Sequence, residues 1–217
     1  MEKLNLILFI SFAAPVLMAL LISGKKIRKG LSFLFIGMTV CLFCGEFNTF
    51  IFDLLPYDMQ YFTSNFTPLF EEFFKAIPIL LYAIVFKPNK KTLLECSVLV
   101  GVGFAVLENA IILGGSASNL SIGLALVRGF GTGVMHCVCT LNIGYGMSFV
   151  NTKRKLLYVG TVAVLIVSII YHSIYNTLMY SPYQLTGFLL PILTFIPVVI
   201  ISKQTEQIDE IDTIEKI

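Results

Sequence analysis

Ionisable side chains lie inside apolar stretches of this sequence, where a charge is costly and is kept mainly for function. They are Glu46, Glu71, Glu72, Lys75, Glu108, Arg128, His136 and His172. The two histidines are the only ones in the chain. Carboxylates and imidazoles can bind a metal ion or exchange a proton, so this set predicts acid–base or metal-assisted chemistry.

Glu71, Glu72 and Lys75 form the first group. On a helix, Lys75 follows Glu71 by four residues and Glu72 by three, so its ammonium can reach either carboxylate. The cation would hold one glutamate ionised and leave the other free to activate water. The alternative is a salt-bridge cluster at the end of a span, but that alone does not explain the other buried polar groups.

Glu108 and Asn109 lie in a second apolar stretch, shortly after Gly101 and Gly103. Glycines without a side chain allow a neighbouring helix to approach closely. The sequence therefore predicts a polar pair on a tightly packed helix.

The two histidines lie in two further apolar stretches. His136 follows Gly129 and Gly133, whose spacing predicts a helix-packing face on the side of the histidine. A phosphate-binding loop would need a preceding strand and a lysine that this sequence lacks. His172 and Asn176 are one helical turn apart and share a face. Because a single buried histidine is often structural, the prediction depends on the whole set.

Long apolar segments must position these residues. The chain has 217 residues, of which 57% are hydrophobic and 13% charged, whereas soluble domains have about a quarter charged. Seven stretches approach the spanning length of about 20 residues, at 4–23, 31–54, 68–86, 93–114, 124–149, 157–180 and 185–202. The sequence predicts one all-α, polytopic transmembrane helical bundle over 1–217, surrounded by lipid. The net charge of +2 gives no reason to expect nucleic-acid binding.

Basic residues follow every second span. They are Lys25, Lys26, Arg28, Lys29, Lys87, Lys90, Lys91, Lys153, Arg154, Lys155 and Lys203. The remaining loops, around Asp58, 116–121 and 181–183, contain neither lysine nor arginine. The positive-inside rule then predicts an outside N-terminus and a cytoplasmic C-terminus, with a short acidic cytoplasmic tail at 203–217.

The predicted topology brings the polar residues to one half of the membrane. At about 1.5 Å per residue from the outer helix ends, the two adjacent glutamates lie about 5 Å deep, Glu108 about 9 Å and His172 about 12 Å. His136 lies about 18 Å deep, or less if its glycine stretch is irregular. This convergence predicts one water-filled site that faces the exterior.

Two chemistries suit three carboxylates and two histidines. A zinc ion could generate a nucleophile from bound water near neutral pH, with a remaining glutamate as base. Alternatively, a glutamate could activate water directly while His and Asn stabilise an oxyanion. Both predict hydrolysis of a carbonyl compound, most simply a peptide bond. The H-E-x-x-H zinc signature is absent from the sequence, so spacing does not favour a metal.

The ordered motifs resemble the PrsW family of intramembrane proteases. They are Glu71-Glu72-x-x-Lys75, Gly103-Phe104-x-x-x-Glu108-Asn109, His136 and His172-x-x-x-Asn176. The resemblance covers about 67–180 and extends to the superfamily of CAAX prenyl endopeptidases and bacteriocin-immunity (Abi) proteins. It implies a multi-pass protease of the bacterial plasma membrane, with catalytic helices at about 68–180. It also implies cleavage of a membrane-anchored substrate near the outer face, such as an anti-sigma factor.

The same resemblance assigns roles to the residues. Glu71 and Glu72 are the water-activating pair, while His136 and His172 bind a metal or stabilise the oxyanion. The supporting residues are Lys75, Glu108, Asn109 and Asn176. If the enzyme uses Zn²⁺, the candidate ligands are His136, His172 and Glu108; a glutamate-based enzyme would need no metal.

Two other classes of function remain open from sequence. Buried glutamates and histidines also form the proton relays of proton-coupled transporters. The polar residues here gather in one leaflet, and no paired broken helices in inverted halves are visible, both of which disfavour transport. A non-catalytic immunity or accessory membrane protein is the third interpretation, which the intact motifs disfavour.

Overall fold

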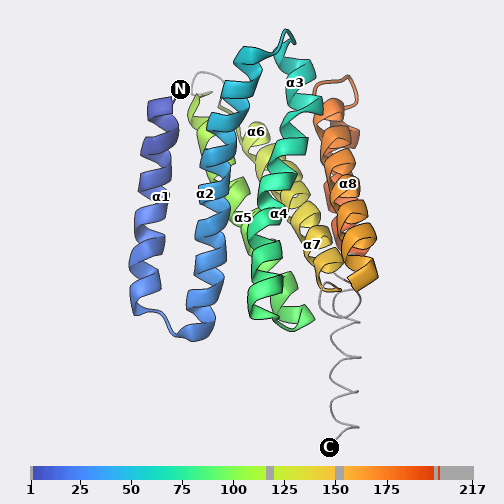
Figure 1. Ribbon diagram of the computed structural model, residues 1–217. Coiled ribbons are helices and arrows are strands. Elements are labelled where there is room, and N and C mark those ends of the chain that lie inside the picture. Colours follow the sequence, from blue (N-terminus) through green and yellow to red (C-terminus); the bar gives the residue numbers. More distant parts are fainter. Residues whose placement is uncertain (1, 116–119, 150–153, 198–199, 201–217) are drawn as a thin grey trace, which may run out of the picture.

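The protein is a bundle of long helices packed side by side (Figure 1). The computed structural model describes residues 2–115, 120–149, 154–197 and 200, and these contain helices but no strand. Five described segments are long and apolar enough to cross a membrane: Lys3–Ile22, Lys25–Leu54, Lys90–Gly115, Ile122–Met147 and Gly160–Met179. The predicted all-α, multi-pass membrane architecture is confirmed to that extent.

The helices follow one another with short connections. They are α1 (Glu2–Ile22), α2 (Lys25–Leu54), α3 (Met59–Asn65), α4 (Thr67–Phe86), α5 (Lys90–Gly115), α6 (Ile122–Leu126), η2 (Val127–Thr132), α7 (Gly133–Met147) and α8 (Arg154–Met179). A further apolar helix spans Gln184–Pro197. The α6, η2 and α7 segments are continuous, and η2 has π-helical hydrogen bonding. Helix α2 begins at Lys25, earlier than the predicted span at 31, because its basic first turn is also helical.

Two predicted spans are not among those five segments. Helix α4 is 20 residues long but contains Glu71, Glu72 and Lys75, so every span-length part of it carries three charges. The described helix Gln184–Pro197 covers only part of the predicted 185–202, because 198, 199, 201 and 202 lie outside the described residues. The basic loop around Lys153 and the predicted acidic tail at 203–217 lie outside the described residues.

Helix α3 occupies part of a region that the sequence predicted to be loop. Asp58 is its N-cap, and its Oδ1 accepts a hydrogen bond from the Tyr61 backbone N–H at 2.8 Å. Such a cap satisfies one of the free N–H groups at a helix start. The polar composition around Asp58 therefore marks a helix start rather than a continuous loop.

Glycines bring three helices into backbone contact. A Cβ added to Gly103 of α5 would collide with the Leu34 carbonyl oxygen of α2. In the opposite direction, a Cβ added to Gly37 of α2 would collide with the Val100 carbonyl oxygen of α5. A Cβ on Gly101 would lie 2.7 Å from the His136 carbonyl oxygen of α7. The predicted close approach at Gly101 and Gly103 is confirmed. The predicted packing face at Gly129 and Gly133 is wrong. Among the described residues, a Cβ added to Gly129 would have nothing within 4 Å, and one added to Gly133 would meet only the Arg128 carbonyl oxygen of its own continuous helix.

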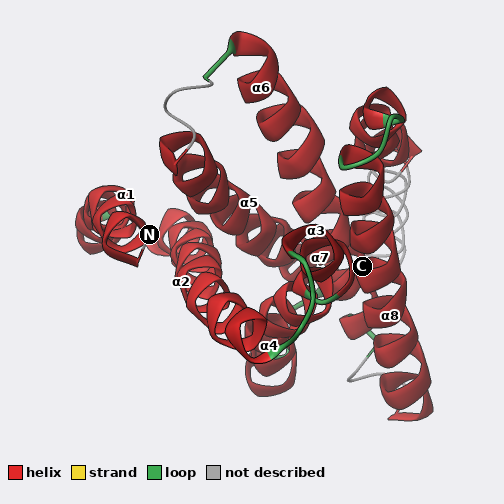
Figure 2. Ribbon diagram, turned by 90° about the horizontal axis from the view of Figure 1, so that it is seen from above, coloured by secondary structure: helices red, strands yellow, loops and turns green. Residues whose placement is uncertain are grey.

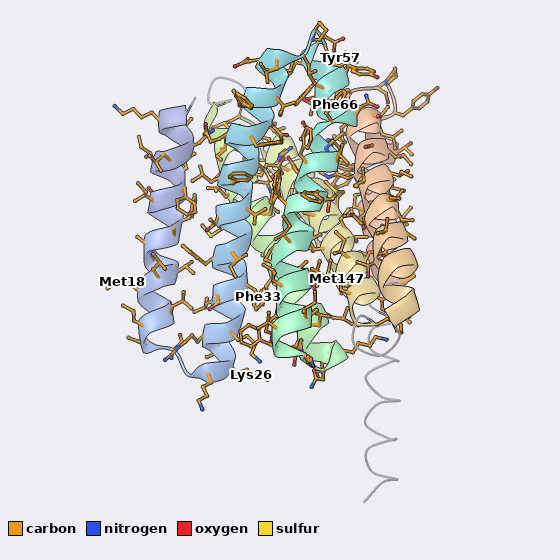
Figure 3. The ribbon with its side chains drawn as sticks, in the orientation of Figure 1. Met18, Lys26, Phe33, Tyr57, Phe66 and Met147 are labelled. Atoms are coloured by element: carbon orange, nitrogen blue, oxygen red, sulfur yellow. The ribbon has the colours of Figure 1, made fainter. Side chains whose placement is uncertain are left out.

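Apolar side chains fill the half of the bundle that contains Phe33 and Met147, toward the end marked by Lys26 (Figure 3). Buried members of this cluster are Phe33, Ala76, Ile79, Ala83, Leu93, Cys96, Val100, Ile143 and Met147. Helix α1 lies at the edge of the bundle, beside α2, when the molecule is seen from above (Figure 2). The ionisable residues singled out in the sequence lie on α2, α4, α5, η2, α7 and α8.

Candidate active site

Helix α4 presents three charged side chains to the interior of the bundle. Glu71, Glu72 and Lys75 begin about one turn after Phe66, which lies at the same end of the molecule as Tyr57 (Figure 3). The side chains of Glu72 and Lys75 are completely buried, and Glu71 is 6% exposed. A salt-bridge cluster at the membrane interface would be open to water. The burial of these three side chains therefore disfavours that alternative.

Lys75 links His136 to Glu72, which in turn contacts His172. Its Nζ lies 2.6 Å from Glu72 Oε1 and 2.9 Å from His136 Nδ1. The same Glu72 Oε1 lies 2.8 Å from Nδ1 of His172 on α8. The ammonium also lies 4.4 Å from the centre of the Phe104 ring, a distance typical of a cation–π contact. Residues from α4, α5, α7 and α8 therefore meet around one buried cation.

The partners of the two histidines determine which ring nitrogens carry protons. His136 Nε2 lies 2.8 Å from Glu108 Oε2, and an ionised carboxylate can only accept, so this nitrogen donates. The Nδ1 of a neutral His136 is then the acceptor for Lys75. By the same argument, His172 Nδ1 donates to Glu72 and its Nε2 keeps a free lone pair. Each carboxylate thus orients one imidazole, as carboxylates do beside metal-binding histidines.

Arg128 fixes Glu108 from the π-helical segment η2. Its Nη2 lies 3.0 Å from Glu108 Oε2 as an ion pair. Its Nε donates to Asn109 Oδ1 at 3.0 Å, and Asn109 Nδ2 donates back to the Arg128 carbonyl oxygen at 3.0 Å. π-helical turns occur frequently at functional sites. With side chains 17% and 21% exposed, Arg128 and Glu108 form the accessible border of an otherwise buried network.

Two polar residues singled out in the sequence lie outside this network. Asn176 shares a helix with His172, but its Nδ2 donates to the Thr63 carbonyl oxygen of α3 at 3.0 Å. That bond ties α8 to α3. Glu46 of α2 is half-buried and is absent from the contacts described for the network.

Glu71, His136 and His172 have the chemistry of a metal site. One ligand atom from each lies within 4.8 Å of the others, and all three side chains are buried. The Oε2 of Glu71 is buried and has no hydrogen-bond partner among the described residues, which is costly unless a ligand satisfies it. Two histidines and one glutamate are a common ligand set of catalytic zinc. These residues therefore fit a metal ion of that kind, with Glu71 as the carboxylate ligand in place of the predicted Glu108, whose Oε2 contacts His136 and Arg128.

Comparison with known families agrees with this chemistry. The model of the PrsW family of intramembrane metalloproteases matches residues 26–202. The chain belongs to this family. Membership makes the protein a membrane protease of the PrsW type, and a metal is in keeping with the family description. No curated protein and no solved structure gives a match to the chain.

The sequence assigned no role to two residues, Arg128 outside the PrsW motifs and Phe104 within one of them. Arg128 was visible as a lone arginine in an apolar stretch, but its pairing with Glu108 depends on the π-helical turn. Phe104 has its ring 4.9 Å from that of His136, and apolar composition alone could not indicate this contact. Phe104 thus contacts a candidate metal ligand directly, and Arg128 contacts Glu108, the hydrogen-bond partner of His136.

Proposed function

We propose that the protein hydrolyses peptide bonds of membrane-anchored proteins near one face of the bilayer. Glu71, His136 and His172 would hold a metal ion, and Glu72 would accept the proton of the attacking water. The observation that carries the proposal is a pair of orphaned oxygens: Oε2 of Glu71 and Oε2 of Glu72 are both buried without a hydrogen-bond partner among the described residues. One is available to bind a cation and the other to accept a proton.

A bound metal ion would supply Lewis-acid activation of water and of the scissile carbonyl. The chain's own residues would do the rest. Glu108 and Glu72 orient the two imidazoles through bonds of 2.8 Å each. Lys75 holds Glu72 in place from the same helix.

Arg128 is the candidate for binding the substrate carbonyl. Its Nη2 is buried and ion-paired with Glu108 at 3.0 Å, but no described residue accepts a hydrogen bond from it. A guanidinium N–H can donate to a carbonyl oxygen and stabilise negative charge that develops there. Its side chain is 17% exposed, so a substrate carbonyl would have to enter beside Glu108 to reach the buried Nη2.

The arrangement of polar and apolar residues disfavours the transporter interpretation. A proton path would need ionisable or hydrated groups across the whole membrane. Below the site, the described core is mostly apolar, with side chains such as Ile79, Val100 and Ile143. Its buried polar groups there are the hydroxyls of Ser97, Thr140 and Ser168 rather than carboxylates, histidines or lysines. The buried charges gather in one half of the bundle instead.

We further propose seven spans, with α4 and the helix Gln184–Pro197 added to the five apolar segments. Helix α4 can cross because its charges are buried inside the bundle rather than exposed to lipid. The basic loops support an outside N-terminus, a cytoplasmic C-terminus and a site near the outer face. A bacterial plasma membrane, an anti-sigma factor as substrate and kinship with the CAAX/Abi superfamily follow only from the motif resemblance.

The proposal can be tested by proteolysis in detergent. Single-span membrane proteins would be incubated with the wild type, with Glu71→Ala/Glu72→Ala and with Glu95→Gln, an exposed carboxylate of α5. We expect the wild type and Glu95→Gln to cleave the same substrate and the double variant to be inactive. A zinc chelator should abolish cleavage by a metalloenzyme, whereas cleavage that resists the chelator would support the glutamate-based mechanism. Equal cleavage by the double variant would contradict the site.

A further inference from the structure

Lys75 is a buried cation that contacts His136, one of the candidate metal ligands. Its ammonium contacts Glu72 and His136, and its side chain has no exposed surface. A lysine needed only to neutralise Glu72 would not have to approach His136 Nδ1 to 2.9 Å. The contact with His136 therefore needs its own explanation.

Both ring nitrogens of His136 are already engaged. Nε2 faces Glu108, which Arg128 holds in turn, and Nδ1 faces Lys75. Metal-binding histidines commonly keep a carboxylate on the nitrogen that does not ligate. The nitrogen that would bind a metal is therefore Nδ1. An ammonium hydrogen and a metal ion cannot share its one lone pair.

The charges of the network also leave room for a further cation. The three carboxylates are those of Glu71, Glu72 and Glu108, and the two cations are Lys75 and Arg128. Counted as ionised, they leave one uncompensated negative charge. An unbalanced charge inside a bundle surrounded by lipid is unfavourable. Lys75 balances the site in part and holds His136 near its binding position.

We propose that Lys75 is a resident cation that occupies His136 Nδ1 in the metal-free protein and is displaced from it when a metal binds. The inference rests on the metal site proposed above. Lys75 and Glu72 lie three residues apart on α4, so the ammonium can leave His136 and keep its 2.6 Å contact with Glu72. The lysine thus lowers metal affinity while it keeps the metal-free site assembled.

The test measures zinc binding and thermal stability of the full-length protein in detergent. Lys75→Gln should bind one zinc ion at least about 10-fold more tightly than wild type, since the competing ammonium is gone. Without metal, it should unfold at a lower temperature than wild type, because Glu72 has lost its buried partner. Added zinc should restore that loss. Lys75→Arg keeps the charge and should not bind more tightly, and the exposed Lys26→Gln should match wild type in both measurements.

A second pair of variants keeps the test valid if Lys75→Gln fails to fold. Glu72→Gln/Lys75→Met removes both members of the ion pair, and the amide oxygen of Gln can still accept from His172. The double variant should bind zinc at least about 10-fold more tightly than Glu72→Gln alone. Equal or weaker binding after removal of Lys75, with zinc bound by wild type, would overturn this inference alone. If no variant binds zinc but wild type still cleaves substrate, both the inference and the proposed metal fail while the peptidase remains.

Discussion

Glu71 and Glu72 are neighbours in sequence with different surroundings. Glu72 Oε1 receives two contacts, from Lys75 and His172, whereas Glu71 lies among the candidate metal ligands. The two carboxylates cannot substitute for each other, because successive residues on a helix point about 100° apart. Their roles should therefore separate on mutation.

Glu72→Gln tests the proposed base. The amide keeps the shape and an oxygen for His172 but cannot accept a proton from water. We expect cleavage to fall at least about 100-fold, the scale of general-base catalysis, with near-normal abundance in the membrane fraction. The rate would be measured on a single-span substrate, with Glu95→Gln as the matched control. Cleavage at the wild-type rate would remove Glu72 from the mechanism.

Arg128→Gln tests the accessible border of the site. The change removes the ion pair with Glu108 and the bond from Nε to Asn109. Residues that support metal-site ligands typically contribute 10- to 100-fold, so we expect kcat/KM to fall by about that factor. Arg28→Gln is the control, since Arg28 is exposed and donates to the Ser23 carbonyl oxygen at 2.8 Å. An unchanged kcat/KM would show that Glu108 is positioned without Arg128.

At the scale of helices, Gly101 sets the distance between α5 and α7. The α7 backbone it touches is the carbonyl of His136 itself. The packing of α5 against α7 and the position of the candidate ligand His136 therefore both depend on Gly101. A small side chain at an interface inside a membrane allows such backbone approach.

Gly101→Ala should displace His136 without touching any charged group. The added methyl would also collide with Thr140 Oγ1, so α7 must move. We expect about 1–3 kcal/mol of destabilisation, the usual cost of overpacking, together with slower cleavage. Thermal unfolding in detergent and cleavage rate would be compared with Gly45→Ala, where an added Cβ has nothing within 4 Å among the described residues. Equal behaviour of the two variants would contradict this coupling.

Hydrophobicity and charge predicted most of the helices, since a long apolar segment in a membrane has few options other than a helix. They also predicted that Glu72 and Lys75 lie close together on one helix face. The ion pair of Arg128 with Glu108 and the bond from Asn176 to Thr63 were beyond the sequence. Both depend on how separate helices approach one another, which periodicity within one helix does not encode.

The whole molecule is polarised from one end to the other. Lys26 lies at one end, and Tyr57 and Phe66 lie at the other (Figure 3). The Tyr57 and Phe66 rings stack with centroids 5.3 Å apart. Aromatic residues favour membrane–water boundaries, and basic residues favour the cytoplasmic side. The site lies nearer the aromatic end, because Glu71 is five residues after Phe66.

Cysteine labelling tests this orientation. An impermeant maleimide should label Tyr57→Cys in intact cells, because Tyr57 is 42% exposed and predicted to face outward. Lys26→Cys should react only after permeabilisation. The wild-type protein, labelled in parallel, serves as the control for reaction of the maleimide with the native cysteines. Labelling of Lys26→Cys alone in intact cells would invert the topology and place the site near the cytoplasm.

The ion pair between Glu72 and Lys75 has a consequence for biosynthesis. His172, which completes the network, is synthesised 100 residues after Glu72, so α4 must enter the bilayer before that partner exists. A single charge at the centre of a transmembrane helix costs about 2.5–3.5 kcal/mol during insertion. A lysine one turn from a glutamate lets the segment enter with two of its three charges already neutralised. The contact that later organises the candidate site thus also eases the passage of α4 from the translocation machinery into lipid.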